Sequence, residues 1–183
     1  MKIIFLGSQG SGKSTQAKLA AKKLKLPVIE MGQLFRDKAA SQDSESFQIK
    51  RALEVGVLVP DEIAIKTLKS RISQSDYGSG YILDGYPRNY AQIEGLEKDI
   101  DKVFYIKVSD QEGIQRLIRR ARDDDNLPVV TKRLQVYHEL TEPLLSYFRQ
   151  RGILEEINGD RTIEEVAEDI ERRLEDAKVT KQS

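Results

Sequence analysis

The nine residues GSQGSGKST (7–15) constrain the fold of this chain more than any other stretch. They fit the pattern G-x-x-x-x-G-K-[ST], directly follow the apolar run IIFL (3–6) and open a helical segment. In this setting, the glycine-rich backbone and the helix N-terminus direct N–H groups at an anion. We expect a polyphosphate-binding loop, with Lys13 near the β- and γ-phosphates and Ser14 near Mg²⁺. The alternative is a glycine-rich turn that only leads into an ordinary helix.

Apolar runs alternate with amphipathic segments along the whole chain. The runs predict strands at 3–6, 27–30, 81–84, 103–108 and 153–157. The segments predict helices at about 13–25, 61–74, 89–98, 110–121, 128–150 and 162–177. Because parallel strands need crossover helices, this order predicts an α/β fold with a parallel sheet flanked by helices. A further helical piece at roughly 31–60 suggests an inserted lobe within a single domain, 1–183.

The composition narrows the classes of partner and site. Lys+Arg and Asp+Glu both number 30 among the 183 residues, and we expect no nucleic-acid partner without an excess of base. The absence of cysteine removes disulfides, thiolate catalysis and cysteine-based zinc sites. The apolar run in the start MKIIFLGSQG is too short for a signal peptide. No apolar run in the chain approaches the length needed to span a membrane. We expect a cytoplasmic protein with no membrane partner.

Asp84, at the end of the run YILD, is the candidate acid for magnesium. Ligands of open α/β sheets bind at the carboxyl ends of the strands, which is where Asp84 falls. Two classes of function compete for such a site: a coupling NTPase that hydrolyses nucleotide, and a small-metabolite kinase. A kinase needs a second anion pocket, and Arg36 and Arg88 stand in turn-like places suited to one. Each arginine could also be a surface charge.

The stretch RLIRRARDDDN (116–126) concentrates four arginines before three aspartates. A solvated helix face would mix charges of both signs, and that explanation covers most charge runs, so the role of this stretch depends on what faces it. The final helix, which contains ERRLED (171–176), is interpreted as a solvated face. His138, the single histidine, has no catalytic or metal-binding neighbours in sequence and is interpreted as structural or exposed.

Several motifs together resemble those of adenylate kinases and related nucleoside monophosphate kinases. They are, in the order found in that family, GSQGSGKSTQ, GQLFR, LVPDE (58–62), DGYPRNYAQ (84–92), RRARDDDN and KRLQVYHELTEPL (132–144). The resemblance runs nearly end to end, and its most specific element is DG[FY]PR with a Gln four residues after the Arg. It implies transfer of a phosphoryl group from ATP to AMP with Mg²⁺, giving two ADP.

The resemblance also implies an architecture. It is a P-loop kinase fold with a five-stranded parallel sheet, a small monophosphate-binding lobe (30–59) and a short lid (119–127). The lid has no cysteine and so no structural zinc, and Asp124 and Asp125 match acids that orient its arginines. The resemblance further suggests a monomer and a cis peptide bond at Tyr86-Pro87.

Site residues follow from the resemblance position by position. Those expected to bind ATP are Gly10, Ser11, Gly12, Lys13, Ser14, Thr15, Arg116, Arg120 and Gly159. Those expected to bind AMP are Met31, Gly32, Arg36, Val57, Leu58, Val59, Gly85, Tyr86, Pro87, Arg88, Gln92, Arg122 and Arg133. The residues expected to act in catalysis are Lys13, Arg88, Arg120, Arg122 and Arg133. Those expected to bind the metal are Ser14 and Asp84.

One segment departs from the family pattern. Where adenylate kinases usually read S-T-G-D, this chain has Glu30, Met31, Gly32 and Gln33. The hydroxyl expected to touch adenine is replaced by a thioether, and an acid is replaced by an amide. The alternative function is therefore a UMP/CMP kinase, against which Gln92 is the best single residue.

Overall fold

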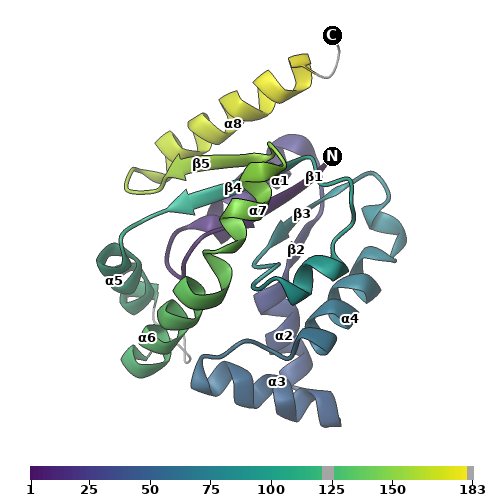
Figure 1. Cartoon of the computed structure of the whole chain (residues 1–183), viewed down its shortest axis with the longest axis vertical. Coiled ribbons are helices and arrows are strands. Elements are labelled where there is room, and N and C mark those ends of the chain that lie inside the picture. Colours follow the sequence, from purple (N-terminus) through teal and green to yellow (C-terminus); the bar gives the residue numbers. More distant parts are fainter. Residues whose placement is uncertain (121–125, 181–183) are drawn as a thin grey trace.

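Five parallel strands form the single sheet of the protein, whose computed structural model describes residues 1–120 and 126–180. The strands are β1 (Lys2–Leu6), β2 (Val28–Glu30), β3 (Tyr81–Asp84), β4 (Lys102–Lys107) and β5 (Leu154–Asn158). Their order is β2-β3-β1-β4-β5, so β1 lies at the centre (Figure 1). Every pairing is parallel, which confirms the predicted α/β class and five-stranded parallel sheet.

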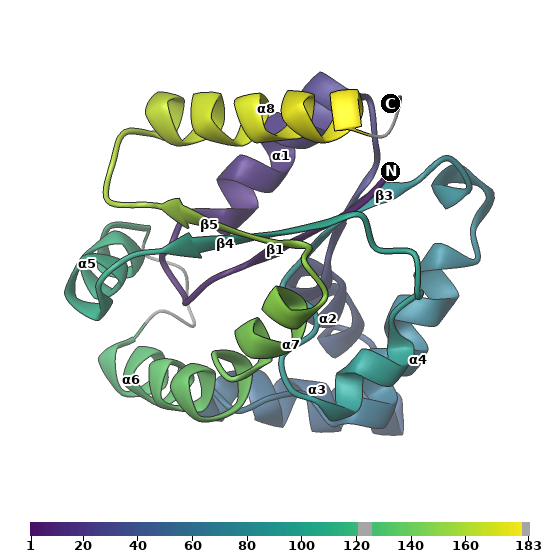
Figure 2. The ribbon, with the colours of Figure 1, turned by 45° about the horizontal axis from the view of Figure 1, so that its top comes forward.

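Each face of the sheet supports its own hydrophobic core. Alternate side chains of a strand point to opposite faces, so Ile3 and Phe5 belong to one core and Ile4 and Leu6 to the other. The first core packs under α1 (Lys13–Leu24) and α8 (Ile163–Thr180). The second packs against α2 (Met31–Ala39), α4 (Asp61–Ile72) and α7 (Leu144–Gln150) (Figure 2). With both faces covered, ligands have access only at the strand ends.

The extra helical piece is a pair of helices, α2 and α3 (Ser44–Val55). The Asp43 side chain begins α3 by accepting a hydrogen bond of 2.7 Å from the Ser46 N–H. Gly56 ends it with a φ of +75°, and a side chain there would also meet the Val129 backbone. Ile49 and Val59 belong to a small core of this unit. Packing thereby fixes the segment after α3 close to α6 (Leu127–Val136).

The predicted helix at 128–150 is wrong as one element, because it is interrupted. It divides into α6, a wider π turn at Tyr137–Thr141, and α7. Pro143 has no N–H to continue the regular hydrogen-bond ladder. Instead the Glu142 N–H donates to the Tyr137 carbonyl at 2.9 Å, five residues back. The turn brings Thr141 toward the strand ends.

The predicted helix at 89–98 is also wrong, since it is only a 3₁₀ turn at Ala91–Gly95. Asn89 accepts a hydrogen bond from the Gln92 N–H at 3.0 Å, which favours a tight turn. A second 3₁₀ turn lies at Ser75–Tyr77, and α5 (Asp110–Arg120) precedes the undescribed residues 121–125. Within the described parts of the chain, no helix is both long and apolar enough to cross a membrane.

Candidate functional site

The glycine-rich loop joins β1 to α1 at the carboxyl edge of the sheet. Gly10 has a φ of +80° and packs against the backbone of Gly113, so a side chain at position 10 would collide with α5. The Lys13 ammonium folds back and donates to the Ser8 carbonyl at 2.9 Å. The first turn of α1 contains no acidic residue. The loop is therefore shaped to accept an anion at the positive end of the helix.

The electrostatic state of Lys13 also indicates an anion site. Burial, together with the nearby charge of Arg88, lowers the pKa of its ammonium to about 7. Arg120 acts in the same direction, and only Asp84 opposes it. A buried cation among other cations is unfavourable unless an anion joins it. The arrangement costs stability in the free protein, and a bound phosphate would relieve that cost.

Asp84 and Ser14 form the predicted metal site. The Ser14 hydroxyl donates to Asp84 Oδ2 at 2.5 Å, and Asp84 is only 6% exposed. Its other oxygen, Oδ1, is buried without a hydrogen-bond partner within the described residues. A carboxylate oxygen and a hydroxyl are ligands suited to Mg²⁺. No three His, Cys, Asp or Glu side chains gather as a metal site in the parts described, so most ligands would come from water and phosphate.

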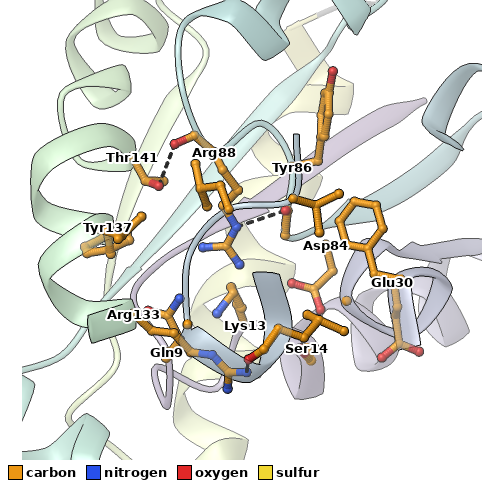
Figure 3. Close-up of a pocket in the computed structure, with 18 of the residues that line it drawn as sticks. Gln9, Lys13, Ser14, Glu30, Asp84, Tyr86, Arg88, Arg133, Tyr137 and Thr141 are labelled. Carbon is orange, nitrogen blue, oxygen red and sulfur yellow. Dashed lines mark hydrogen bonds between the residues drawn. The ribbon is translucent and has the colours of Figure 1, made fainter. Parts of the chain in front are cut away.

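A first cavity opens between the α2–α3 unit and the strand ends (Figure 3). Predicted residues that line it are Gly32, Arg36, Val57, Leu58, Val59, Gly85, Tyr86, Arg88, Gln92 and Arg133. In Figure 3 the charged ends of Lys13, Arg88 and Arg133 point into the same space. Such a convergence of cations is suited to a phosphate group.

Arg88 is held in place by several hydrogen bonds. Its Nε donates to the Gly85 carbonyl at 2.9 Å, and its backbone N–H donates to Gln92 Oε1 at 2.8 Å. The Thr141 hydroxyl donates to the Arg88 carbonyl at 2.7 Å (Figure 3). Burial lowers the pKa of the guanidinium. The preceding Tyr86-Pro87 bond is cis, as predicted.

A second cavity of about 510 Å³ lies over the glycine-rich loop, a size typical of small-molecule sites. Predicted residues that line it are Gly10, Ser11, Gly12, Lys13, Ser14, Thr15, Arg116, Arg120 and Gly159. Arg116 donates to the Gly159 carbonyl at 3.1 Å and is paired with Glu112 at 2.7 Å. The structure thus joins two residues, Arg116 and Gly159, that are 43 positions apart in sequence.

The two cavities adjoin. Both are lined by Gly10, Lys13, Ser14, Glu30 and Arg120. An anion in each cavity would meet the other at Lys13, beside the Asp84–Ser14 pair. This arrangement can bring two phosphate-bearing molecules end to end over a shared set of cations.

Two predicted site residues among those described line neither cavity. Met31 is fully buried in the core under the sheet, and Pro87 lines neither cavity. Arg122 lies outside the described residues, as do Asp124 and Asp125 and with them most of the expected lid at 119–127. His138 is 42% exposed and pairs with Asp110 and Glu142 on the surface, as interpreted from the sequence.

Several residues that line the cavities were not expected from the sequence. In the first cavity they include Gln9, Phe35, Leu53, Tyr137 and Thr141. In the second they include Lys18, Arg161, Thr162 and Ile163. Gln9, Phe35, Tyr137 and Thr141 lie within the matched motifs, but no contact was assigned to them from the sequence. Tyr137 and Thr141 belong to the π turn, for which Pro143 was the available signal.

Comparisons with known proteins agree with this geometry. The family model "Adenylate kinase" matches residues 5–153. An adenylate kinase of Prochlorococcus marinus (strain NATL2A) is 38% identical, covering 94% of this chain and 98% of the relative. One of Lachnoclostridium phytofermentans is 37% identical, covering 93% and 96%. One of Archaeoglobus fulgidus is 35% identical, covering 97% and 100%.

Proposed function

Because the chain belongs to the adenylate kinase family and transfers a phosphoryl group from ATP to AMP, we propose that its two cavities divide these nucleotides between them. The products are two ADP. The single observation that carries the division is the shared lining of the cavities, with Lys13 between them. Reacting groups held end to end need little further chemistry from the protein.

The first cavity suits AMP. Arg36 and Arg88 would bind its phosphate, and the segment Val57–Val59 would line the base. Gln92 lines the same cavity and carries an amide that can pair with the edge of a base. The hydrogen bond from Arg88 Nε to the Gly85 carbonyl supports this role, because a guanidinium that is already oriented loses less freedom on binding.

The second cavity suits ATP. The loop Gly10–Thr15 would bind its phosphates through backbone N–H groups and Lys13. Arg116 would pack on the adenine, with Gly159 on the other side of the ring, and their hydrogen bond supports this placement. The γ-phosphate would then lie at the junction of the cavities.

Catalysis falls to the cations at that junction. Lys13, Arg88, Arg120 and Arg133 line the first cavity and would stabilise the charge on the transferring group, and we assign Arg122 to the same set from the sequence. No general base is needed, because positioning and electrostatic stabilisation supply most of the rate of phosphoryl transfer.

Ser14 and Asp84 would hold Mg²⁺, and the unpartnered Asp84 Oδ1 supports this assignment. A bound Mg²⁺ would neutralise charge on the phosphates of ATP. The residues themselves keep the carboxylate fixed at the end of β3 and in contact with the start of α1. The lobe at 30–59, the lid at 119–127, a monomeric state and a cytoplasmic location stay predictions.

The comparisons do not favour a UMP/CMP kinase or a coupling NTPase. The direct test measures ADP formation from ATP with AMP, UMP, CMP or GMP, and with no monophosphate. We expect the highest kcat/KM with AMP and far slower hydrolysis without an acceptor. A higher value with UMP would favour the first alternative. Equal rates with and without AMP would favour the second.

The same assay tests the shared lysine. We expect Lys13→Met to lower kcat at least about a hundredfold, because one oriented donor can contribute 10²–10³ to the rate. Lys22→Met is the matched control, since Lys22 is an exposed lysine of the same helix and should leave kcat unchanged. Similar activity in the two variants would contradict the assignment of Lys13.

A further inference from the structure

Gln92 is fixed in the structure to an unusual degree for a residue that lines a cavity. It is 2% exposed and lies in the 3₁₀ turn after Pro87. The Tyr86 hydroxyl donates to its main-chain carbonyl at 2.5 Å, and its N–H donates to Asn89 Oδ1 at 3.0 Å. The main chain of Gln92 is therefore held on both sides before any ligand binds.

The side-chain amide of Gln92 has two partners of opposite kind. Its Oε1 accepts from the Arg88 backbone N–H at 2.8 Å, and its Nε2 donates to Asp61 Oδ1 at 2.8 Å. A backbone N–H can only donate, and an ionised carboxylate can only accept. Turning the amide over would place two donors together at Arg88 and two acceptors together at Asp61. These two contacts permit one orientation of the amide.

Asp61 is itself well placed for this purpose. It begins α4, and its Oδ1 also accepts from Asn89 Nδ2 at 2.8 Å. The same carboxylate oxygen thus joins the start of α4 to the turn that follows Arg88. Asp61 itself lines neither cavity. It would therefore affect a ligand through the side chains that it contacts, Gln92 and Asn89.

We propose that Asp61 is a positioning residue that sets the hydrogen-bonding polarity of Gln92 and thereby selects 6-amino over 6-oxo purines. The proposal rests on the assignment of Gln92 to the base of AMP. One amide hydrogen and one oxygen lone pair of Gln92 remain for a ligand after the two contacts above. Adenine presents a donor at N6 and an acceptor at N1, which this pair can satisfy.

Hypoxanthine reverses that pattern. It presents an acceptor at O6 and a donor at N1, so IMP differs from AMP only at the edge in question. With the amide locked, IMP would set donor against donor and acceptor against acceptor. Leaving buried polar groups unpaired is how a site rejects a near-identical ligand. The discrimination thus depends on an amide that cannot turn over.

The experiment measures kcat and KM for AMP and IMP, and their dissociation constants by calorimetry, for the wild type, Asp61→Asn and Asp61→Ala. In Asp61→Ala we expect the AMP/IMP ratio of kcat/KM to fall about tenfold or more, the value of a hydrogen bond to a charged group. The change should lie mainly in KM and in the dissociation constants, with kcat within about threefold. Asp61→Asn, which keeps a neutral acceptor, should give an intermediate ratio.

Two controls separate positioning from a structural role. Glu62→Ala removes the exposed acid next to Asp61 in the first turn of α4 and should leave the ratio unchanged. In a Gln92→Leu background, Asp61→Ala should change the ratio by less than about twofold, because its effect passes through Gln92. Thermal melts of all variants identify any that fail to fold, and calorimetry on Asp61→Asn then decides alone.

The outcomes distinguish this proposal from the assignment on which it rests. If Gln92→Leu leaves the wild-type AMP/IMP ratio intact, the assignment of Gln92 to the base is wrong. If Gln92→Leu removes discrimination but Asp61→Ala preserves it, only the role of Asp61 is overturned. Equal losses toward AMP and IMP in Asp61→Ala would also overturn it, because they would indicate general damage to the site.

Discussion

Arg133 belongs to α6 and lines the first cavity. Its guanidinium donates to the Leu53 carbonyl at 3.4 Å, which links α6 to α3. Its charge lies close enough to Arg88 to oppose ionisation of that side chain. Like charges brought together in this way do not favour folding. Both arginines line the first cavity, and we expect them to bind the same anion there.

We accordingly expect Arg133→Ala to lower kcat at least about a hundredfold, below the 10³–10⁵ reported for arginines that clamp a transferring phosphoryl group. The melting temperature should stay near the wild-type value, because a partly exposed charge contributes only about 0–1 kcal/mol. Lys132→Ala is the matched control, since it removes the neighbouring cation, which lines neither cavity. Steady-state kinetics and thermal melts measure both effects. A kcat within a few-fold of wild type would refute the role.

At the residue scale, the sequence predicted groups that carry their own local signal. Lys13 and Ser14 stand in a spacing typical of a phosphate-binding loop, and Asp84 ends an apolar run. Asp61 was visible within LVPDE, but its contact with Gln92 spans 31 positions and has no local signal. Met31 illustrates the converse: the motif placed it at the base, whereas the fold buries it in the core. Which face of a segment is buried is decided by packing between distant elements.

At the scale of elements, the strands β1, β3 and β4 were predictable because nearly all of their residues are buried and apolar. All five lie within one or two residues of their predicted bounds. Helix ends were less predictable. Near Pro143, and in the turn where Asn89 accepts a hydrogen bond from the Gln92 N–H, regular helix is replaced by local hydrogen bonds that amphipathic periodicity does not reveal. The π turn matters for the site, because it places Thr141 against Arg88. Irregular helical turns of this kind often occur at functional sites.

The last helix also differs from its expected solvated face. Asp169 of α8 has a side chain only 10% exposed, and it pairs with Arg161, Arg172 and Arg173 at 2.8–3.0 Å. Arg173 continues to Glu155 of β5 at 2.8 Å. Although burial opposes ionisation of Asp169, hydrogen bonds from the arginines hold the pKa of its carboxyl below the ordinary value. The ion pairs thus attach α8 to the edge strand.

This network predicts a pH-dependent contribution to stability. Because the folded pKa of Asp169 is depressed, its contribution is present above the unfolded pKa of about 3.9 and is lost as pH falls through the folded value. Asp169→Asn should lower the free energy of unfolding at pH 7 by about 1.5–3 kcal/mol, the range for hydrogen bonds to charged groups. The deficit should shrink below about pH 4.

Urea unfolding at pH 7, 5 and 3.5 measures that deficit. Glu168→Gln is the matched control, because Glu168 is the exposed neighbour on the same helix and should change stability by less than about 0.5 kcal/mol at every pH. A deficit in Asp169→Asn that stays constant down to pH 3.5 would refute an electrostatic origin. It would indicate lost packing instead.

At the scale of the whole molecule, balanced charge hides a strongly uneven distribution. Acidic and basic residues number 30 each, yet Lys13, Arg88, Arg120 and Arg133 gather around one cavity. Among the described acidic residues, Asp84 and Glu30 also line that cavity, whereas Asp169 and Glu155 pair with arginines at α8. The four basic side chains form a cationic centre at which we expect the two nucleotides to bind. Ligand binding should couple the loop, the α2–α3 unit and α6, which all line that centre.

A cation at this centre should therefore stabilise the complex with ligand without stabilising the free protein. A diadenosine polyphosphate that fills both cavities at a hundred times its dissociation constant should stabilise the wild type by about 2.7 kcal/mol. For a chain of this size, that corresponds to a rise in melting temperature of about 5–11 °C.

Lys13→Met should lose most of this rise, because Lys13 is common to both cavities. Without ligand, however, the variant should melt no lower than the wild type, since it removes a buried cation that Arg88 and Arg120 repel. Thermal melts of both proteins with and without the ligand measure all four values. A free variant that melts well below the wild type would mean that Lys13 stabilises the fold, and the cationic centre would then need another explanation.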